Sequence, residues 1–359
     1  MTALDHDQCY RALSARDRRF DGVFFVGVET TGIYCRPICP ARTPGRTRCR
    51  FFTRAAEAEK AGFRACFRCR PERAPGLSIA DATPRLVQGA LAKIAAGELD
   101  RGSVDDVARS LGVTSRHLRR AVEAAVGVSP IELAQTRRLG LAKLLLHETA
   151  LPLTEVAFAS GFASVRRFNA AFVERFGQPP SAVRRAHAEA RDAAAAITIR
   201  LDARAPFASD ALLAFLRGRA IPGVEEVTGS SYRRFAAIGA ASGWLEATVD
   251  PLRPGILVRL DASLVPAIGE VVTRLRSLFD LDARPDVIDA SLRRDRRLAP
   301  LVARTPGLRV PGAFDGWELL VRAILGQQVS VAAATTISGR LVRAFGAPPR
   351  FPSASTTTR

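Results

Sequence analysis

The stretches YCRPICPAR (residues 34–42) and GFRACFRCRPE (residues 62–72) decide how the amino-terminal part of this chain folds. They carry two cysteine pairs, Cys35/Cys39 and Cys66/Cys69, with three and two residues between the members of each pair. A pair at this spacing can reach a single ion, and four soft thiolates suit zinc in a tetrahedron. The sequence therefore predicts a four-cysteine site for one Zn²⁺ ion.

Arginine crowds both cysteine pairs, whereas the acidic residues between positions 36 and 73 are only Glu57, Glu59 and Glu72. An anionic zinc–thiolate centre surrounded by cations is suited to phosphate. Three interpretations stay open at this point. The site is a structural zinc site, a rubredoxin-type iron site, which the arginine shell fits poorly, or a reactive zinc site whose thiolate attacks an alkyl group.

The bulk composition favours a multidomain protein that binds a polyanion. The chain has 359 residues, 47% of them hydrophobic, and 53 Lys and Arg against 35 Asp and Glu, a formal charge of +18. This length suits two or three domains, and the charge favours nucleic acid. A high-GC coding bias explains part of the arginine content but not its clustering around the cysteines.

No signal peptide opens the chain, and no apolar run approaches the length of a membrane span. Six cysteines in such a chain indicate a reducing compartment, where metal binding outranks disulfides. We therefore expect a cytoplasmic, nucleoid-associated protein without a membrane partner. Cys9 and Cys49 are interpreted as thiols that do not bind the metal.

Residues 77–187 are predicted to be helical and contain an internal repeat. Segments 111–130 and 160–180 share a glycine turn followed by a helix. We expect apolar stripes at Leu118, Val122 and Ala125 in the first copy, and at Phe168, Phe172 and Phe176 in the second. If the repeat occurred once, a small helical bundle with a solvated arginine face would be an equally good interpretation. Two copies joined by one helix, from Ser129 to about His147, favour a reader of the DNA major groove. The side chains expected to contact DNA there are Arg116, Arg119, Arg120, Ser164, Arg166, Arg167 and Asn169.

VGVETTGIYCRPICPAR (26–42) together with AGFRACFRCRPE (61–72) resembles the amino-terminal domain of the Ada adaptive-response proteins. The resemblance implies that Cys35 irreversibly accepts a methyl group from a methylphosphotriester in DNA, with Cys39, Cys66 and Cys69 as the other zinc ligands. Methylation would turn a thiolate into a thioether, remove one negative charge and weaken repulsion from the DNA backbone. Arginines near the cysteines are expected to contact DNA, namely Arg36, Arg42, Arg64 and Arg68.

VSPIELAQTRRLGLAKLLL (128–146) and ASGFASVRRF (159–168) resemble the AraC-type DNA-binding domain. That resemblance implies two recognition helices in successive major grooves of double-stranded DNA at promoter sites. It also implies transcriptional activation, with RNA polymerase as a partner.

The carboxy-terminal part is predicted to form a small α+β layer followed by helices. Strands are predicted at 197–201, 231–238, 244–249 and 256–260, and helices at 209–217 and 264–279. LLAFLRGRAIPGVE (212–225) and RAILGQQVS (322–330) resemble AlkA-type 3-methyladenine DNA glycosylases. The resemblance implies that Gln328 probes a flipped, damaged base and that Phe215 lines the base pocket.

The catalytic aspartate and the helix-hairpin-helix of that family lie further along the chain. The 31 residues after Gln328 (359 − 328) contain neither Asp nor Glu. We therefore expect a truncated, inactive glycosylase module. Its helices at 315–326 and 330–345 would expose apolar faces, and a polar tail would follow at 351–359.

The sequence thus predicts a multidomain α+β protein with linkers at 71–76 and 191–196. The expected parts are a small zinc-binding α/β domain (1–76), an all-α tandem helix-turn-helix domain (77–187), an AlkA-like α+β subdomain (192–285) and the incomplete start of a helix-hairpin-helix glycosylase domain (286–359). The favoured function is a DNA alkylation-damage response protein that couples methyl transfer to Cys35 with sequence-specific DNA binding. The alternatives are a DNA-3-methyladenine glycosylase II, and a plain AraC-type regulator with structural zinc.

Overall fold

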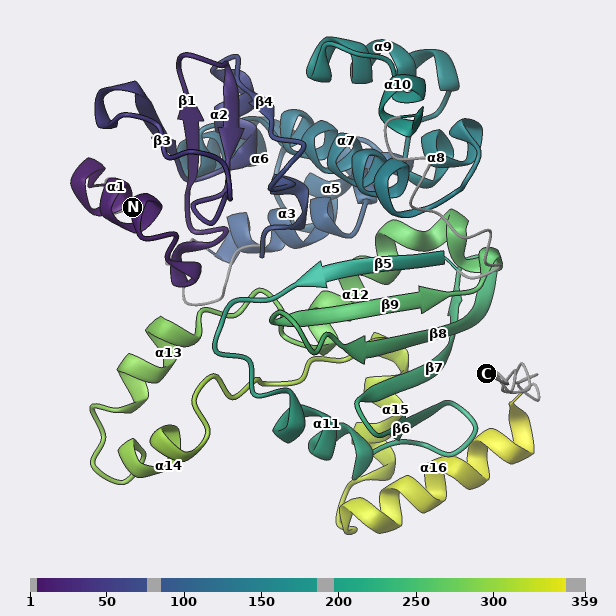
Figure 1. Cartoon of the computed structure of the whole chain (residues 1–359). Helices are drawn as coiled ribbons and strands as arrows, with labels where there is room; N and C mark the ends of the chain where they lie inside the picture. Colours follow the sequence, from purple (N-terminus) through teal and green to yellow (C-terminus); the bar gives the residue numbers. More distant parts are fainter. Residues whose placement is uncertain (1–4, 76–84, 186–196, 347–359) are drawn as a thin grey trace, which may run out of the picture.

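The computed structural model describes residues 5–75, 85–185 and 197–346 (Figure 1). The predicted linker at 191–196 and the predicted tail at 351–359 lie outside the described residues. The other predicted linker, at 71–76, is in part a short 3-10 helix, η3 (Pro71–Arg73). Within the described segments, no helix has both the length and the apolar character needed to cross a membrane.

The amino-terminal part is a four-stranded sheet with the strand order β3-β1-β2-β4. Strand β1 pairs antiparallel with β2 and β3, whereas β2 and β4 run parallel. The elements are α1 (His6–Ser14), η1 (Arg18–Phe20), β1 (Phe25–Val28), β2 (Ile33–Cys35), η2 (Arg46–Arg48), β3 (Cys49–Phe52), α2 (Ala55–Lys60) and β4 (Arg64–Ala65).

Helix α2 begins at Ala55, with Arg54 as its N-cap residue. The carboxylate of Glu57 accepts hydrogen bonds from the backbone N–H groups of Thr53 and Arg54, at 2.8 and 3.2 Å. These bonds satisfy amides at the helix start.

The helical part contains the predicted tandem repeat. The helices are α3 (Arg85–Ala95), α4 (Glu98–Arg101), α5 (Val104–Ser110), α6 (Ser115–Val126), α7 (Pro130–Glu148), α8 (Leu153–Ala159), α9 (Val165–Phe176) and α10 (Pro180–Arg185). The repeated glycines all have a positive φ, of 69° and 88° in the turns before α6 and α9 and of 75° and 70° after them. Glycine adopts this left-handed conformation without strain, which explains its recurrence.

The predicted apolar stripes of this part are confirmed, and side chains cap two of its helices. Ser103 and Asp106 form a capping box at α5, and Ser129 and Glu132 form another at α7. The three phenylalanines of α9 are buried. In α6, Leu118 and Val122 are buried together with Val126, and Ala125 is half-buried and packs against the same core cluster.

The third part is built on an antiparallel sheet with the strand order β5-β9-β8-β7-β6. Its elements are β5 (Ile197–Asp202), α11 (Ser209–Arg217), β6 (Glu225–Thr228), β7 (Ser231–Ile238), β8 (Ala241–Val249), β9 (Gly255–Leu260), η5 (Ala262–Ala267) and α12 (Ile268–Leu278). The predicted strands and helices are confirmed, except that the helix expected at 264–279 is divided into η5 and α12. Strand β6 was not predicted, because Glu225 and Glu226 break its apolar alternation.

Helices α13 (Pro285–Leu292), α14 (Ala299–Arg304), α15 (Gly316–Leu325) and α16 (Val331–Phe345) complete the described chain. Helices α15 and α16, in yellow, lie beside α11 and β6 (Figure 1). The expectation of exposed apolar faces on these two helices is confirmed. Trp317 is 72% exposed, Ile324 58% and Phe345 83%.

One apolar core runs through the first three parts of the molecule. It contains Tyr34 from the amino-terminal sheet, Leu145 and Phe172 from the helical part, and Ile199 and Leu275 from the third part. The cysteine-bearing sheet therefore packs against both other parts and is not tethered only by linkers.

Candidate metal centre

The parallel pairing of β2 with β4 brings the two cysteine pairs together. Ile33 lies opposite Arg64 and Tyr34 opposite Ala65, so Cys35 and Cys66 leave neighbouring strands side by side. The backbone N–H of Cys66 donates to the Tyr34 carbonyl at 3.0 Å. In the first knuckle, the Cys39 N–H donates to the Arg36 carbonyl at 3.1 Å and closes a tight turn.

The four sulfur atoms of Cys35, Cys39, Cys66 and Cys69 all lie within 4.8 Å of one another. A tetrahedral zinc ion with Zn–S bonds of about 2.3 Å needs sulfurs about 3.8 Å apart, so a small adjustment accommodates it. The four cysteines are 7 to 9% exposed. The residues thus fit one zinc ion in a site closed by protein.

The acidity of these thiols shows why the cluster needs a cation. Hydrogen bonds with Cys39 and the other two thiols raise the pKa of Cys35 far above its usual range, and burial adds to this. The bond with Cys35 lowers the pKa of Cys39 to about 7. Four crowded sulfurs cannot all ionise by themselves, and a bound divalent ion is what allows it.

The two remaining cysteines stand outside this group, as predicted. The Cys49 thiol donates to the Gly45 carbonyl at 3.4 Å, and burial raises its pKa. Cys9 packs in a different apolar cluster, where burial and then Asp5 raise its pKa to about 11. Both have the character of structural thiols.

Arg36 is not at the surface, which corrects its prediction as a DNA contact. It is 4% exposed, and its guanidinium pairs with Asp21 and with Asp202, the latter at 2.9 Å. A buried, doubly paired guanidinium is not free to meet a phosphate. The other predicted arginines near the cysteines are exposed, namely Arg42, Arg64 and Arg68.

The predicted contacts of the two recognition helices lie on exposed faces. This holds for Arg116, Arg119 and Arg120 on α6 and for Arg166, Arg167 and Asn169 on α9. Ser164 is half-buried, and its hydroxyl caps α9 by accepting from the Arg167 N–H at 3.3 Å. Its place at the start of α9 leaves it beside the exposed face.

Gln328 and Phe215 border one side of the third part. Gln328 is exposed in the turn between α15 and α16 with a φ of 60°, an unusual conformation for a residue other than glycine. Phe215 is 41% exposed, with the Arg219 guanidinium 3.7 Å from its ring centroid. A cavity of about 210 Å³ is lined by their neighbours Arg219 and Val329, among other residues, but by neither Gln328 nor Phe215.

Several residues at the metal centre were not predicted from the sequence. Lys143 of α7 reaches the second cysteine knuckle, and Glu72 and Asp202 form ion pairs beside it. The sequence signal available for Lys143 was its position as a lone lysine inside the apolar run LAKLLL (141–146).

The metal centre predicts one zinc ion per chain and its dependence on the four cysteines. Cys66→Ser removes a ligand, so the purified variant should hold less than about a tenth of the zinc of the native protein. The matched control is Cys49→Ser, a buried thiol outside the group, which should keep one equivalent. Elemental analysis of both proteins checks this, and equal zinc content in the two variants would contradict the ligand set.

Three protein-family models match the chain. They are the metal binding domain of Ada over residues 8–72, a helix-turn-helix domain over 107–186 and the AlkA N-terminal domain over 198–315. The resemblances that the sequence motifs carry are thereby confirmed.

Curated proteins agree with this order of domains. A Mycobacterium tuberculosis H37Rv protein described as a "probable bifunctional transcriptional activator/DNA repair enzyme AlkA" is 42% identical over 350 residues, which cover 96% of this chain and 70% of that protein. DNA-3-methyladenine glycosylase 2 of Escherichia coli K12 is 39% identical, covering 38% of this chain and 46% of that protein. The bifunctional enzyme Ada of the same strain is 49% identical over 73 residues, 20% of this chain and 21% of that protein. The chain therefore belongs to the family of bifunctional transcriptional activator/DNA repair enzymes of the AlkA type.

Proposed function

We propose that the four-cysteine centre repairs alkylated DNA by transferring a methyl group from a methylphosphotriester to Cys35. The observation that carries this proposal is the unequal surroundings of the four sulfurs. Backbone N–H groups of Ala41, Cys69 and Arg36 are directed at the sulfurs of Cys39, Cys66 and Cys69, respectively. The strongest influences on the Cys35 sulfur are the other three thiols, followed by burial.

This difference favours Cys35 as the nucleophile. A hydrogen bond to a thiolate lowers its pKa, and nucleophilicity falls as the pKa falls. A bound zinc ion would keep all four thiols ionised at neutral pH. Cys35 then carries the least stabilised, and so the most reactive, charge of the four.

The transfer balances without a further reagent. The Cys35 sulfur attacks the methyl carbon, an S–C bond forms and the methyl C–O bond breaks. The phosphate oxygen leaves with the bonding electrons, which restores an ordinary phosphodiester anion. Because the thioether does not revert, each protein molecule acts once.

The exposed cations supply a DNA-binding surface around this chemistry. We propose that Arg42, Arg64 and Arg68 contact phosphates near the lesion, whereas the exposed faces of α6 and α9 read promoter DNA in successive major grooves. Methylation of Cys35 removes one negative charge beside the DNA and strengthens binding. The bound protein then recruits RNA polymerase as an activator.

A second candidate function is base excision by the AlkA-like part. The left-handed, exposed conformation of Gln328 favours it, since such strain gathers at functional sites. Its signature would be free 3-methyladenine released from methylated DNA at the same rate by the native protein and by Cys35→Ser.

Methyl transfer predicts a defined mass change on one residue. After incubation with methylated duplex DNA, the native protein should gain one methyl group, about 14 Da, located on the peptide that contains Cys35. Peptide mass spectrometry checks this, with Cys49→Ser as the matched control that should gain the same group. Unchanged methyl uptake by Cys35→Ser would refute the assignment. A zinc-loaded native protein that takes up no methyl group would favour a plain regulator with structural zinc.

If α9 recognises the DNA sequence, an exposed arginine on α9 should contribute more to DNA binding than an exposed arginine elsewhere in the same domain. Arg166→Ala should weaken binding to a duplex selected by the native protein by roughly 10- to 100-fold. The control is Arg109→Ala on α5, an exposed side chain paired with Asp106, which should change binding less than about threefold. Equal losses in the two variants, measured by fluorescence anisotropy at one salt concentration, would argue against α9 as a reading helix.

A further inference from the structure

Lys143 places a charged side chain in the buried interior of the protein. It lies on α7, the helix that joins the two repeats, and its side chain is fully buried. Burying an ammonium group costs several kcal/mol unless its donors are all satisfied. The groups that accept hydrogen bonds from the Lys143 ammonium therefore indicate its structural role.

Those partners belong to the cysteine-bearing sheet and the segment after it. The Lys143 ammonium donates to the backbone carbonyl of Cys66 at 2.7 Å and to the Glu72 carboxylate at 2.9 Å. It also lies 4.7 Å from the ring centroid of Phe67, the residue that follows Cys66. Burial by itself would raise the pKa of Glu72, but Lys143 and then Arg70 outweigh burial and hold the pKa below its usual value.

A second buried cation holds the other cysteine of this knuckle. The Arg36 guanidinium donates to the Cys69 carbonyl at 3.3 Å, and the Arg36 backbone N–H donates to the Cys69 sulfur at 3.4 Å. The same guanidinium pairs with Asp202 at the end of β5. The second knuckle is thus held from two sides, by α7 and by a link to the third part of the molecule.

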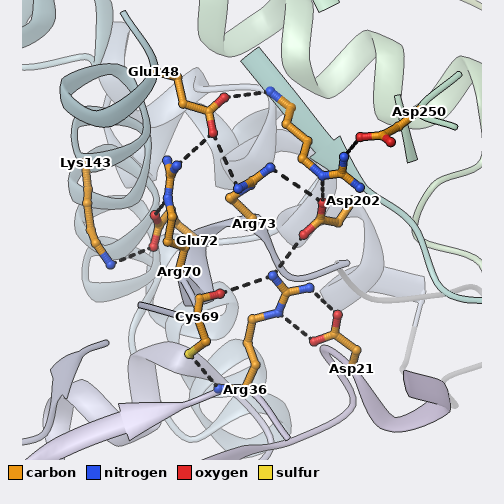
Figure 2. Close-up of polar contacts among 11 residues, drawn as sticks. Asp21, Arg36, Cys69, Arg70, Glu72, Arg73, Lys143, Glu148, Asp202 and Asp250 are labelled. Atoms are coloured by element: carbon orange, nitrogen blue, oxygen red, sulfur yellow. Dashed lines mark hydrogen bonds and ion pairs between the residues drawn. The ribbon is translucent and has the colours of Figure 1, made fainter. Parts of the chain in front are cut away.

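Figure 2 shows the ion pairs of Lys143 and Arg36 as parts of one network of alternating charge. From Lys143 it passes through Glu72 and Arg70 to Glu148, which is also on α7. Arg73 lies between Glu148 and Asp202, at 3.6 and 3.8 Å, and Asp202 leads to Arg36. The backbone N–H of Arg200 on β5 donates to Glu148 at 2.7 Å. The network therefore joins the metal centre to both of the other parts.

We propose that Lys143 is a positioning residue of the metal centre that the helix-turn-helix domain supplies. By fixing the Cys66 carbonyl, it fixes the peptide that carries a ligand and hence the direction of that sulfur. Its charge also opposes the net charge of −2 that four thiolates and one Zn²⁺ ion would carry (+2 − 4). Zinc binding then stabilises the packing of α7 against the cysteine-bearing part. That packing in turn slows the loss of zinc, because a coupling between two sites is reciprocal. This inference needs the metal site but not the methyl transfer.

The test compares zinc release from two variants that alter the same interface. Lys143→Met keeps the length of the side chain but loses the bond to Cys66. It should transfer zinc to an excess of chelator about 10- to 100-fold faster than the native protein. Glu59→Gln is the matched control, because Glu59 binds Thr136 and Arg175 across the interface, and Tyr34 in its own part, without touching a ligand carbonyl. It should change the rate less than about threefold.

Two outcomes of that comparison would overturn the proposal. One is native-like zinc release from Lys143→Met. The other is equal acceleration in Glu59→Gln, which would mean that the interface as a whole, rather than the Cys66 contact, retains the metal. Circular dichroism of both variants checks that they fold.

A second measurement on the native protein does not depend on the folding of any variant. Hydrogen exchange is followed with zinc bound and after chelation. Removal of zinc should speed the exchange of amides in 139–147 of α7 and 197–202 of β5, and should leave the pairing of β7 with β8 unchanged. Unaltered exchange in both α7 and β5 would contradict the coupling.

Discussion

Four thiols within 4.8 Å of one another are the constraint on which the rest of this structure depends. They cannot all ionise without a divalent cation, and only the ionised forms bind a metal or attack a methyl group. The fold meets this constraint by placing Cys35 and Cys66 at the ends of parallel neighbouring strands. Backbone N–H groups stabilise the sulfurs of Cys39, Cys66 and Cys69, and we propose Cys35 as the reactive thiolate.

The same centre is also where the parts of the molecule meet. Buried cations hold the Cys66 and Cys69 carbonyls, one from the helix between the two DNA-reading repeats and one that reaches the AlkA-like sheet. A buried ion pair adds little net stability by itself, but it specifies one arrangement of the groups that it joins. A change of charge at the cysteines would therefore act on the helical part and on the AlkA-like sheet, in addition to its direct effect on DNA binding.

The sequence was sufficient where the signal was local. Cysteine spacing identified the thiol cluster, the connecting helix starts at Ser129 as predicted, and alternation predicted β7 to its last residue. Prediction from the sequence failed where residues far apart in the chain determine the surroundings of a side chain. The prediction for Arg36 was wrong because Asp21 and Asp202, which lie far apart in the chain, bury its guanidinium. Lys143 was overlooked because a lysine in an apolar run shows no partner until Cys66 and Glu72 are in place.

We propose that the charge at Cys35 sets the affinity for DNA, and titration of one duplex before and after methylation tests this most directly. A unit charge beside phosphates is worth on the order of 1 kcal/mol or more, so the fully methylated, zinc-loaded protein should bind on the order of tenfold more tightly at the same salt concentration. Protein treated in parallel with unmethylated DNA is the reference. Equal or weaker binding after methylation would contradict the account.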